Sequence, residues 1–360
     1  MRTLHRRALS RATLARQLLL ERSERSPVEA VDHLVGLQAQ APLAPYVALW
    51  SRLVEFRPQS LAELVADGRA VRVTVMRGTI HLVTAGDAGP LRALLQSMLE
   101  RRFASSPYAR HLVGVDLAEV EARARELLAE GPLTRPKLSR GLQQWWPDRD
   151  PASLAYMVTF RVPLVQVPPR GVWGRSGPIA YSPYEVDQST VDVDGVVMRY
   201  LGAFGPASVR DIQAWCGLTR LGEVVQRLRA GLETFRDEQG VELFDLPDAP
   251  RPDPETPAPP RFLPEYDNIL LSHADRTRVN PDGHPVPLLP GNGAAAGTVL
   301  VDGWFRALWQ LDRPRATVTV SPLGRLARQE RNALTKEAHA LAAFLMGQAG
   351  QVEFSKDPNG

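Results

Sequence analysis

Apolar positions recur at helical spacing around two Gly-Pro pairs in the middle of the chain. Residues 124–142 and 198–216 each predict an apolar helix, then Gly131-Pro132 or Gly205-Pro206, and then a second helix with apolar residues at matching places. Glycine and proline end helices, because glycine readily adopts positive φ and proline cannot continue the hydrogen-bond ladder. The two segments therefore predict an internal repeat of a helix, a turn and a helix.

The residues after each pair continue the same pattern. Residues 151–167 predict a third helix that runs into a strand, and residues 219–246 predict a third helix and two strands about a turn at Glu238-Gln239-Gly240. In the later repeat, Ser208 and Asp211 have the spacing of a capping box for the second helix. Helix, turn, helix, helix and hairpin in this order form the winged-helix pattern, whose third helix and hairpin usually contact DNA.

A more divergent first unit is predicted over residues 8–84. Ser26-Pro27-Val28-Glu29 is a capping box with proline at the first helical position. Residues 71–75 alternate between apolar and polar positions as a strand does, and residues 80–83 return from a tight turn. Thr84 then caps the helix that follows the hairpin. The unit therefore has a helix before its hairpin, beginning at Pro27, and another after it.

The remaining third of the chain has a different pattern. Residues 247–264 hold eight prolines in 18 residues and predict an extended, semi-rigid linker. Residues 266–280 and 298–320 predict strands, and residues 323–346 predict one long helix that begins at Ser321-Pro322. This C-terminal portion is therefore predicted to be α+β and to pack on the repeats.

The predicted fold class is α+β and predominantly helical, with tandem winged-helix (helix-turn-helix) repeats and a C-terminal α+β portion. The predicted divisions are a first unit over 1–110, a second over 111–192, a third over 193–246, the proline-rich linker over 247–264 and the C-terminal portion over 265–360.

Composition and charge favour an anionic partner without proving one. The chain has a net charge of +3 and a pI of about 9.2, and only three of its 43 basic residues are lysine. Either a GC-rich coding sequence or bidentate binding of phosphate by arginine can explain the excess of arginine over lysine. Cys216 is the single cysteine, which excludes an internal disulfide and a thiolate metal site. No apolar run approaches the length of a membrane span, and the basic N-terminus lacks the apolar core of a secretion signal, so we expect a cytoplasmic protein.

The usual catalytic motifs are absent from the sequence. The glycine-rich segment 291–297 lacks the Lys-Ser/Thr ending of a phosphate loop, and the seven histidines are scattered, so we expect no cofactor and no metal. The remaining polar pair is Gln38 and Gln40, which would lie on one side of an extended backbone. Pro42 disfavours helix at Ala41 and predicts a break close to the pair. From composition alone, the pair is read as ordinary polar residues at the end of a helix.

Three blocks of sequence resemble the AlkZ-type (YcaQ-like) family of tandem winged-helix DNA glycosylases, which carry a Gln-x-Gln or Gln-x-Asp motif. The blocks are Gly36–Gln40, Met76–Val83 and Phe262–Arg278. The resemblance implies a monofunctional glycosylase that removes cationic N7-alkylated purines from double-stranded DNA, and some members unhook interstrand crosslinks or protect makers of DNA-alkylating natural products. It implies that Gln38 and Gln40 are the catalytic pair, in a monomeric bacterial protein that acts on the nucleoid.

The chemistry of such lesions suits an amide pair. An N7-alkylated guanine is already cationic and leaves with little acid assistance, so the barrier lies in the oxocarbenium-like sugar and in placing a water. A glutamine carbonyl can accept a hydrogen bond from that water and turn its dipole toward the developing positive charge. Because an amide does not titrate near neutral pH, positioning and electrostatics are the expected roles.

Several other residues are expected to support the site. The predicted DNA contacts are Arg77, Lys137, Arg140, Arg276 and Arg278, although each can equally be a solvated surface charge. His273 and Asp267 either line the site or stabilise a turn. The alternatives to an enzyme are a winged-helix transcription regulator and a structural DNA-bridging protein. The third helix of the second unit is apolar with a single arginine, Arg161, which suits packing or backbone contact better than reading of base edges.

Overall fold

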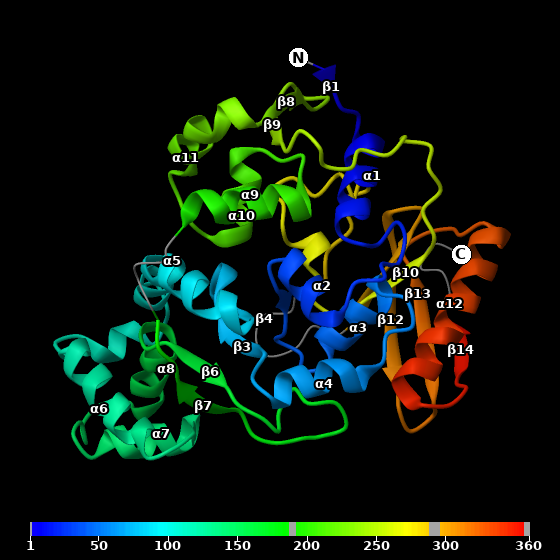
Figure 1. Ribbon diagram of the computed structural model, residues 1–360. Coiled ribbons are helices and arrows are strands. Elements are labelled where there is room, and N and C mark those ends of the chain that lie inside the picture. The colour runs from blue at the N-terminus through cyan, green and yellow to red at the C-terminus, as the bar shows by residue number, and fades with distance from the viewer. Residues whose placement is uncertain (1, 187–191, 288–295, 356–360) are drawn as a thin grey trace.

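The computed structural model describes residues 2–186, 192–287 and 296–355, and within them the chain forms three sheets surrounded by helices (Figure 1). The largest sheet has the strand order β2-β4-β3-β6-β7-β5. Its strands are β2 (Leu37–Gln38), β3 (Ala70–Thr74), β4 (Ile80–Thr84), β5 (Leu133–Thr134), β6 (Leu164–Gln166) and β7 (Ala180–Pro183). The helical elements around it are α2 (Pro27–His33), α3 (Ala44–Arg52), α4 (Pro58–Ala66), η1 (Met76–Gly78), α5 (Ala85–Ala104), η2 (Ala109–Leu112), α6 (Leu117–Ala129), α7 (Arg135–Gln143) and α8 (Pro151–Arg161).

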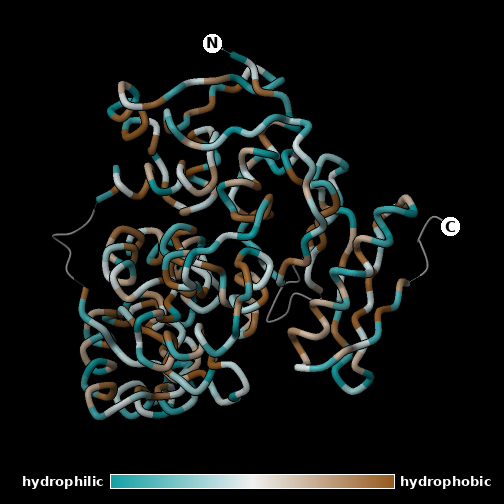
Figure 2. Tube along the Cα trace, turned by 45° about the vertical axis from the view of Figure 1, so that its right-hand side comes forward, coloured by the Kyte–Doolittle hydropathy of each residue, from teal (hydrophilic) through white to brown (hydrophobic). Residues whose placement is uncertain are grey.

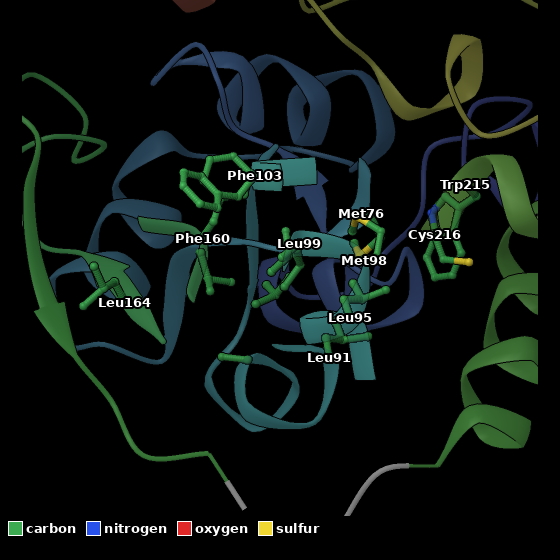
Figure 3. Packing of buried hydrophobic residues seen from close by; sticks show 14 of the residues in the cluster. Met76, Leu91, Leu95, Met98, Leu99, Phe103, Phe160, Leu164, Trp215 and Cys216 are labelled. Carbon is green, nitrogen blue, oxygen red and sulfur yellow. The ribbon is translucent and has the colours of Figure 1, made fainter. Parts of the chain in front are cut away.

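This sheet crosses the boundary predicted between the first and second units. Strand β3 pairs antiparallel with β4 on one side and with β6 on the other, where Arg72 lies opposite Gln166. The apolar residues on α5 and α8 belong to one buried cluster with the sheet and with α9 (Val193–Phe204) and α10 (Val209–Cys216) (Figure 3). Residues 1–110 and 111–192 therefore share a sheet and a core.

The second sheet contains the predicted hairpin of the third unit. Its elements are α9 (Val193–Phe204), α10 (Val209–Cys216), α11 (Leu221–Leu228), η4 (Arg229–Gly231), β8 (Glu233–Arg236) and β9 (Glu242–Asp245). All follow the predicted order, and the Ser208–Asp211 capping box is formed at α10. The N-terminal strand β1 (Arg2–Thr3) adds to β8 in parallel. The helices and hairpin of the pattern are thus confirmed as elements.

Helix α1 (Arg6–Arg16) connects the second sheet to the C-terminal α+β portion through buried arginines. The Arg16 guanidinium binds both carboxylate oxygens of Asp245 on β9, and Arg11 forms an ion pair with Asp302. The basic N-terminus thus forms a helix. At least two of its arginines serve internal ion pairs, so the arginine excess is not purely a DNA-facing surface.

The third sheet has the order β10-β11-β12-β13-β14 and is covered by α12. Its elements are β10 (Arg261–Leu263), η5 (Asn268–Leu270), β11 (Gly297–Val301), β12 (Trp304–Asp312), β13 (Thr317–Pro322), α12 (Arg328–Met346) and β14 (Gln351–Phe354). The predicted apolar face of α12 is buried, comprising Leu334, Ala338, Leu341 and Leu345. In Figure 2 the hydrophobic residues are spread through all three sheet regions, consistent with several linked cores.

Three predictions for this C-terminal region were wrong. The linker ends before residue 261, because Phe262 is fully buried and residues 261–263 pair with β11. Residues 266–280 form η5 and turns in place of strands, since the Asp267 side chain caps η5 by accepting from the Ile269 amide. Pro322 ends β13, and α12 begins only at Arg328, where Glu330 accepts from the Ala327 amide.

Candidate functional site

Gln38 lies on the short strand β2, which pairs antiparallel with β4 opposite His81. The neighbours Leu37 and Ala39 are both buried in one apolar cluster. Because side chains alternate across a strand, Gln38 faces the opposite side from them. The amide of Ala39 continues the pairing by donating to the carbonyl of Ile80. The strand covers Leu37 and Gln38, and the chain bends at Gln40; Gln38 is buried and Gln40 is exposed.

The turn before β2 requires glycine. Gly36 has φ of +94°, and a Cβ there would lie 2.7 Å from Cγ1 of Val83. The carbonyl of Gly36 accepts a hydrogen bond of 2.8 Å from Nδ2 of Asn268. Since Asn268 belongs to the third sequence block, this bond brings the third block against the first. The entry into the Gln38 strand is thus fixed from two sides.

Arg72 supports the residue between the two glutamines. Its Nη2 donates to the carbonyl of Ala39 over 2.7 Å from β3, which is separated from β2 by β4 in the sheet. Burial lowers the pKa of the Arg72 guanidinium to about 10. The bond holds the backbone at the centre of the Gln-Ala-Gln segment.

Arg77 links the glutamine strand to the third unit. It lies in η1 with φ of 56°, a left-handed conformation that is uncommon for a residue with a side chain. Its Nη2 donates to Oε1 of Gln38 at 2.8 Å and lies 3.2 Å from Nε2 of His81. Its Nη1 donates to the carbonyl of Trp215 at 3.1 Å. Arg77 therefore contacts three protein acceptors, and the geometry gives it an internal role where a DNA contact was expected.

His81 is a neutral partner in this network. Arginine can only donate, so Nε2 of His81 accepts from Arg77, and Nδ1 carries the proton toward the carbonyl of Thr79 at 3.1 Å. Burial, followed by the positive charge of Arg77, lowers the pKa of His81 to about 3. The imidazole is therefore uncharged at neutral pH.

Packing fixes the turn that carries Arg77. Met76 is buried next to Met98 of α5, with Trp215 and Cys216 of α10 on the adjacent side (Figure 3). Burial lowers the pKa of Arg77 to about 10, and the positive charge of Arg276 acts in the same direction. Arg276, which is half-buried, thus lies within electrostatic range of the network. Cys216 is buried and free, as its place on a helix indicated.

The other predicted contacts separate into exposed and buried residues. Lys137 and Arg140 are exposed on α7, in a different part of the molecule from α3 (Figure 1). Arg278 is buried, where it donates to the carbonyl of Pro206 at 2.8 Å and faces Asp211 at 3.8 Å. This burial argues against the predicted DNA contact for Arg278 and gives it a structural role.

His273 and Asp267 are also buried, which favours the turn-stabilising alternative for both. Asp267 accepts two hydrogen bonds from Arg52, at 2.8 and 2.9 Å, while it caps η5. Nε2 of His273 lies 3.0 Å from the carbonyl of Phe204. Burial lowers the pKa of His273 to about 3, so this side chain is neutral.

Sequence reasoning missed His81, Asn268 and Arg72 as members of the site. His81 and Asn268 stand inside the second and third blocks of the resemblance, so the blocks themselves were the available signal. The sequence held no such signal for Arg72, because a single arginine in an alternating strand predicts a surface position. In the structure Arg72 is buried. Among the described residues, no three His, Cys, Asp or Glu side chains are grouped closely enough to hold a metal ion. No helix in the same ranges could cross a membrane.

Comparison with known proteins places this geometry in context. The sequence model of the family described as DNA glycosylase AlkZ-like matches residues 31–344. The interstrand DNA cross-link repair glycosylase of Streptomyces sahachiroi is 25% identical over 350 residues, spanning 86% of this chain and 88% of that protein. The solved structure of the Streptomyces sahachiroi DNA glycosylase AlkZ has a TM-score of 0.70 at 19% identity, and the match covers 98% of this chain and 100% of that chain. The structural likeness shows a common fold.

Proposed function

The chain belongs to the AlkZ-like DNA glycosylase family, and we propose that it hydrolyses the N-glycosidic bond of cationic N7-alkylated purines in double-stranded DNA. In this proposal it acts as a monomeric, monofunctional glycosylase without a metal or cofactor. Gln38 and Gln40 are the catalytic pair. Membership of an enzyme family argues against the transcription regulator and the structural DNA-bridging protein.

The observation that carries the proposal is the orientation of the Gln38 amide. Arginine has no acceptor, so the Arg77 hydrogen bond fixes the Gln38 oxygen, and not its nitrogen, toward the guanidinium. A fixed amide loses little freedom when the substrate binds, and such preorganisation is what electrostatic and positional catalysis need.

The exposed Gln40 is suited to reach the substrate. Its carbonyl can accept a hydrogen bond from the attacking water, and the second lone pair of the Gln38 oxygen can accept another. The C–N bond breaks with its electron pair going to the cationic base, which leaves neutral, while water adds to the sugar and releases a proton to solvent. Neither amide titrates, so both glutamines orient water and face the developing positive charge with their carbonyl dipoles.

Arg77 serves as a positioning residue in this account. Its three contacts are all protein acceptors, so its charge is directed to the network that holds Gln38. Arg276 is the basic residue placed to meet a phosphate near the site, since it lies within electrostatic range of Arg77. Lys137 and Arg140 are exposed and are proposed to bind the DNA backbone farther away, on one of three winged-helix units.

Bulky adducts and interstrand crosslinks belong to the proposed substrate range. The support is the name of the Streptomyces sahachiroi relative, an interstrand DNA cross-link repair glycosylase that aligns with most of this chain. The test of the proposed function is base release from a duplex with one N7-methylguanine, read as strand cleavage after alkali. Cleavage that depends on Gln38 and Gln40 supports it, and no cleavage by the wild type contradicts it.

A further inference from the structure

A second feature is formed in part by residues that follow the glutamine segment closely along the chain. A pocket of about 780 Å³ is formed between the start of α3, the third sequence block, and the sheet covered by α12. Its lining residues include Leu43, Val47, Glu265, Trp309, Leu311 and Leu345. A volume in the range typical of drug-sized ligands exceeds what a single methylated base needs.

Chain connectivity places this pocket next to the catalytic pair. Leu43 is the N-cap of α3 and follows Gln40 by three residues. Glu265 precedes Asn268 by three residues, and Asn268 binds the Gly36 carbonyl just before the Gln38 strand. Two walls of the pocket are therefore continuous with the two segments that position the glutamines.

The lining combines polar and apolar side chains, and its apolar part is firmly held. The Trp309 indole donates to the carbonyl of Leu263 at 2.8 Å and packs edge-on against Phe262. Gly297 leaves room for it, because a Cβ at residue 297 would lie 2.1 Å from Nε1 of Trp309. Val47 is almost fully buried on the opposite wall. An aromatic or aliphatic group that enters gains contact area without rearranging these residues.

Glu265 is a partly buried carboxyl group that lines this pocket. No basic side chain in the described ranges forms an ion pair with it, and burial raises its pKa. At the rim, Asp312 accepts from the Arg315 amide, and Arg313 reaches toward the carbonyl of Leu345. A partly buried carboxylate without a cationic partner loses some of its hydration, and a cationic ligand would offset that cost.

We propose that this pocket receives the part of a bulky adduct that extends beyond the purine, an apolar group carrying a protonated amine that pairs with Glu265. The inference rests on the proposed function, because it assigns a substrate class to that same site. It makes Glu265 a specificity-determining residue that contacts the adduct and takes no part in bond cleavage.

The test uses the full-length protein and three duplexes that differ in one N7-guanine substituent: methyl, naphthylmethyl, and aminomethyl-naphthylmethyl. Single-turnover base release and the dissociation constant are measured for wild type, Glu265→Gln and Glu63→Gln. Glu265→Gln keeps the side-chain volume and removes the charge, and Glu63 is an exposed residue of α4 that serves as the matched control. Thermal melting checks that all three proteins are folded.

We expect Glu265→Gln to weaken binding and slow base release about 10- to 100-fold for the amine-bearing adduct alone, as for a lost charged hydrogen bond. Leu311→Trp, which fills the pocket, should slow both naphthyl adducts and spare the methyl one. Equal effects of Glu265→Gln on all three duplexes, or none on any, would overturn the proposal. If wild type releases no base from any duplex, the proposed function fails, and the dissociation constants alone decide the pocket: a loss confined to the amine-bearing adduct supports it, and unchanged constants overturn it.

Discussion

Nη2 of Arg77 donates to Oε1 of Gln38 over 2.8 Å, and this bond gives an otherwise ordinary glutamine a single orientation. The arginine is itself held by the carbonyl of Trp215, which lies 138 residues away along the chain. The strand that carries Gln38 and the helix that ends at Cys216 are thereby coupled through one guanidinium. The catalytic account depends on this coupling more than on any exposed charge.

Arg77→Met should slow base release about 100-fold at saturating DNA, because a misplaced catalytic group costs that order of rate. The dissociation constant for lesion DNA should change far less. Arg77→Lys keeps one donor and should recover part of the rate. Single-turnover kinetics and fluorescence anisotropy separate the two effects. Arg328→Met, at an exposed position of α12, is the control; a larger change in affinity than in rate for Arg77→Met would instead make Arg77 a DNA contact.

His81 should make stability depend on pH. Its folded pKa is lowered to about 3 from an ordinary value near 6.5, so below pH 6.5 the unfolded chain takes up a proton that the folded chain does not. The stability that this group contributes is complete above pH 6.5 and falls by about 1.4 kcal/mol per pH unit as the pH drops toward 3.

Urea unfolding at intervals between pH 7.5 and 5 measures this slope. His81→Gln should reduce the dependence of the free energy of unfolding on pH by the contribution of one proton. His339→Gln, at an exposed position, controls for removal of a histidine. Identical slopes in wild type and His81→Gln would mean that the imidazole is not buried neutral.

Asp267→Asn tests whether Asp267 is structural or lines the site. Removing one partner of a buried ion pair with Arg52 should lower the free energy of unfolding by about 3–5 kcal/mol. The rate of base release per folded molecule should remain within a few-fold of wild type at a temperature where the variant is folded. A stable variant with a large loss of rate would show that Asp267 lines the site.

Lys137→Ala and Arg140→Ala test the proposed backbone contacts on α7. Each should weaken binding to any duplex and lower the salt slope of log K by about one, without changing base release at saturating DNA. Lys336→Ala on the exposed face of α12 should leave the slope as it is. Unchanged slopes for both α7 variants would show that this face does not meet DNA.

Local signals in the sequence predicted much of the fold. The capping box at Ser26, the box at Ser208 and the Thr84 cap each form as expected, because all their atoms lie within a few residues. The order of helices and hairpin in residues 193–246 followed from such signals. These features need no long-range contact to be read.

The errors arose where distant residues decide the structure. Residues 266–280 are apolar enough for strands, but the Arg52–Asp267 ion pair and the Asp267 cap favour a tight turn there. The shared sheet of the first two units depends on β3 meeting β6, about 90 residues later, and no local pattern encodes that pairing. For the same reason the sequence identified Gln38 but not the arginine contact that orients it.

The most direct test of the account is base release from one N7-methylguanine duplex by wild type, Gln38→Ala and Gln40→Ala. Gln59→Ala on α4 is the control, since Gln59 is exposed and outside the site. Each reaction is treated with alkali, and binding to the same duplex is measured alongside. The account predicts cleavage with wild type and the control, and retained binding with at least a 100-fold slower release for each catalytic variant, about 2.7 kcal/mol or more of transition-state stabilisation. Full base release by both glutamine variants would contradict it.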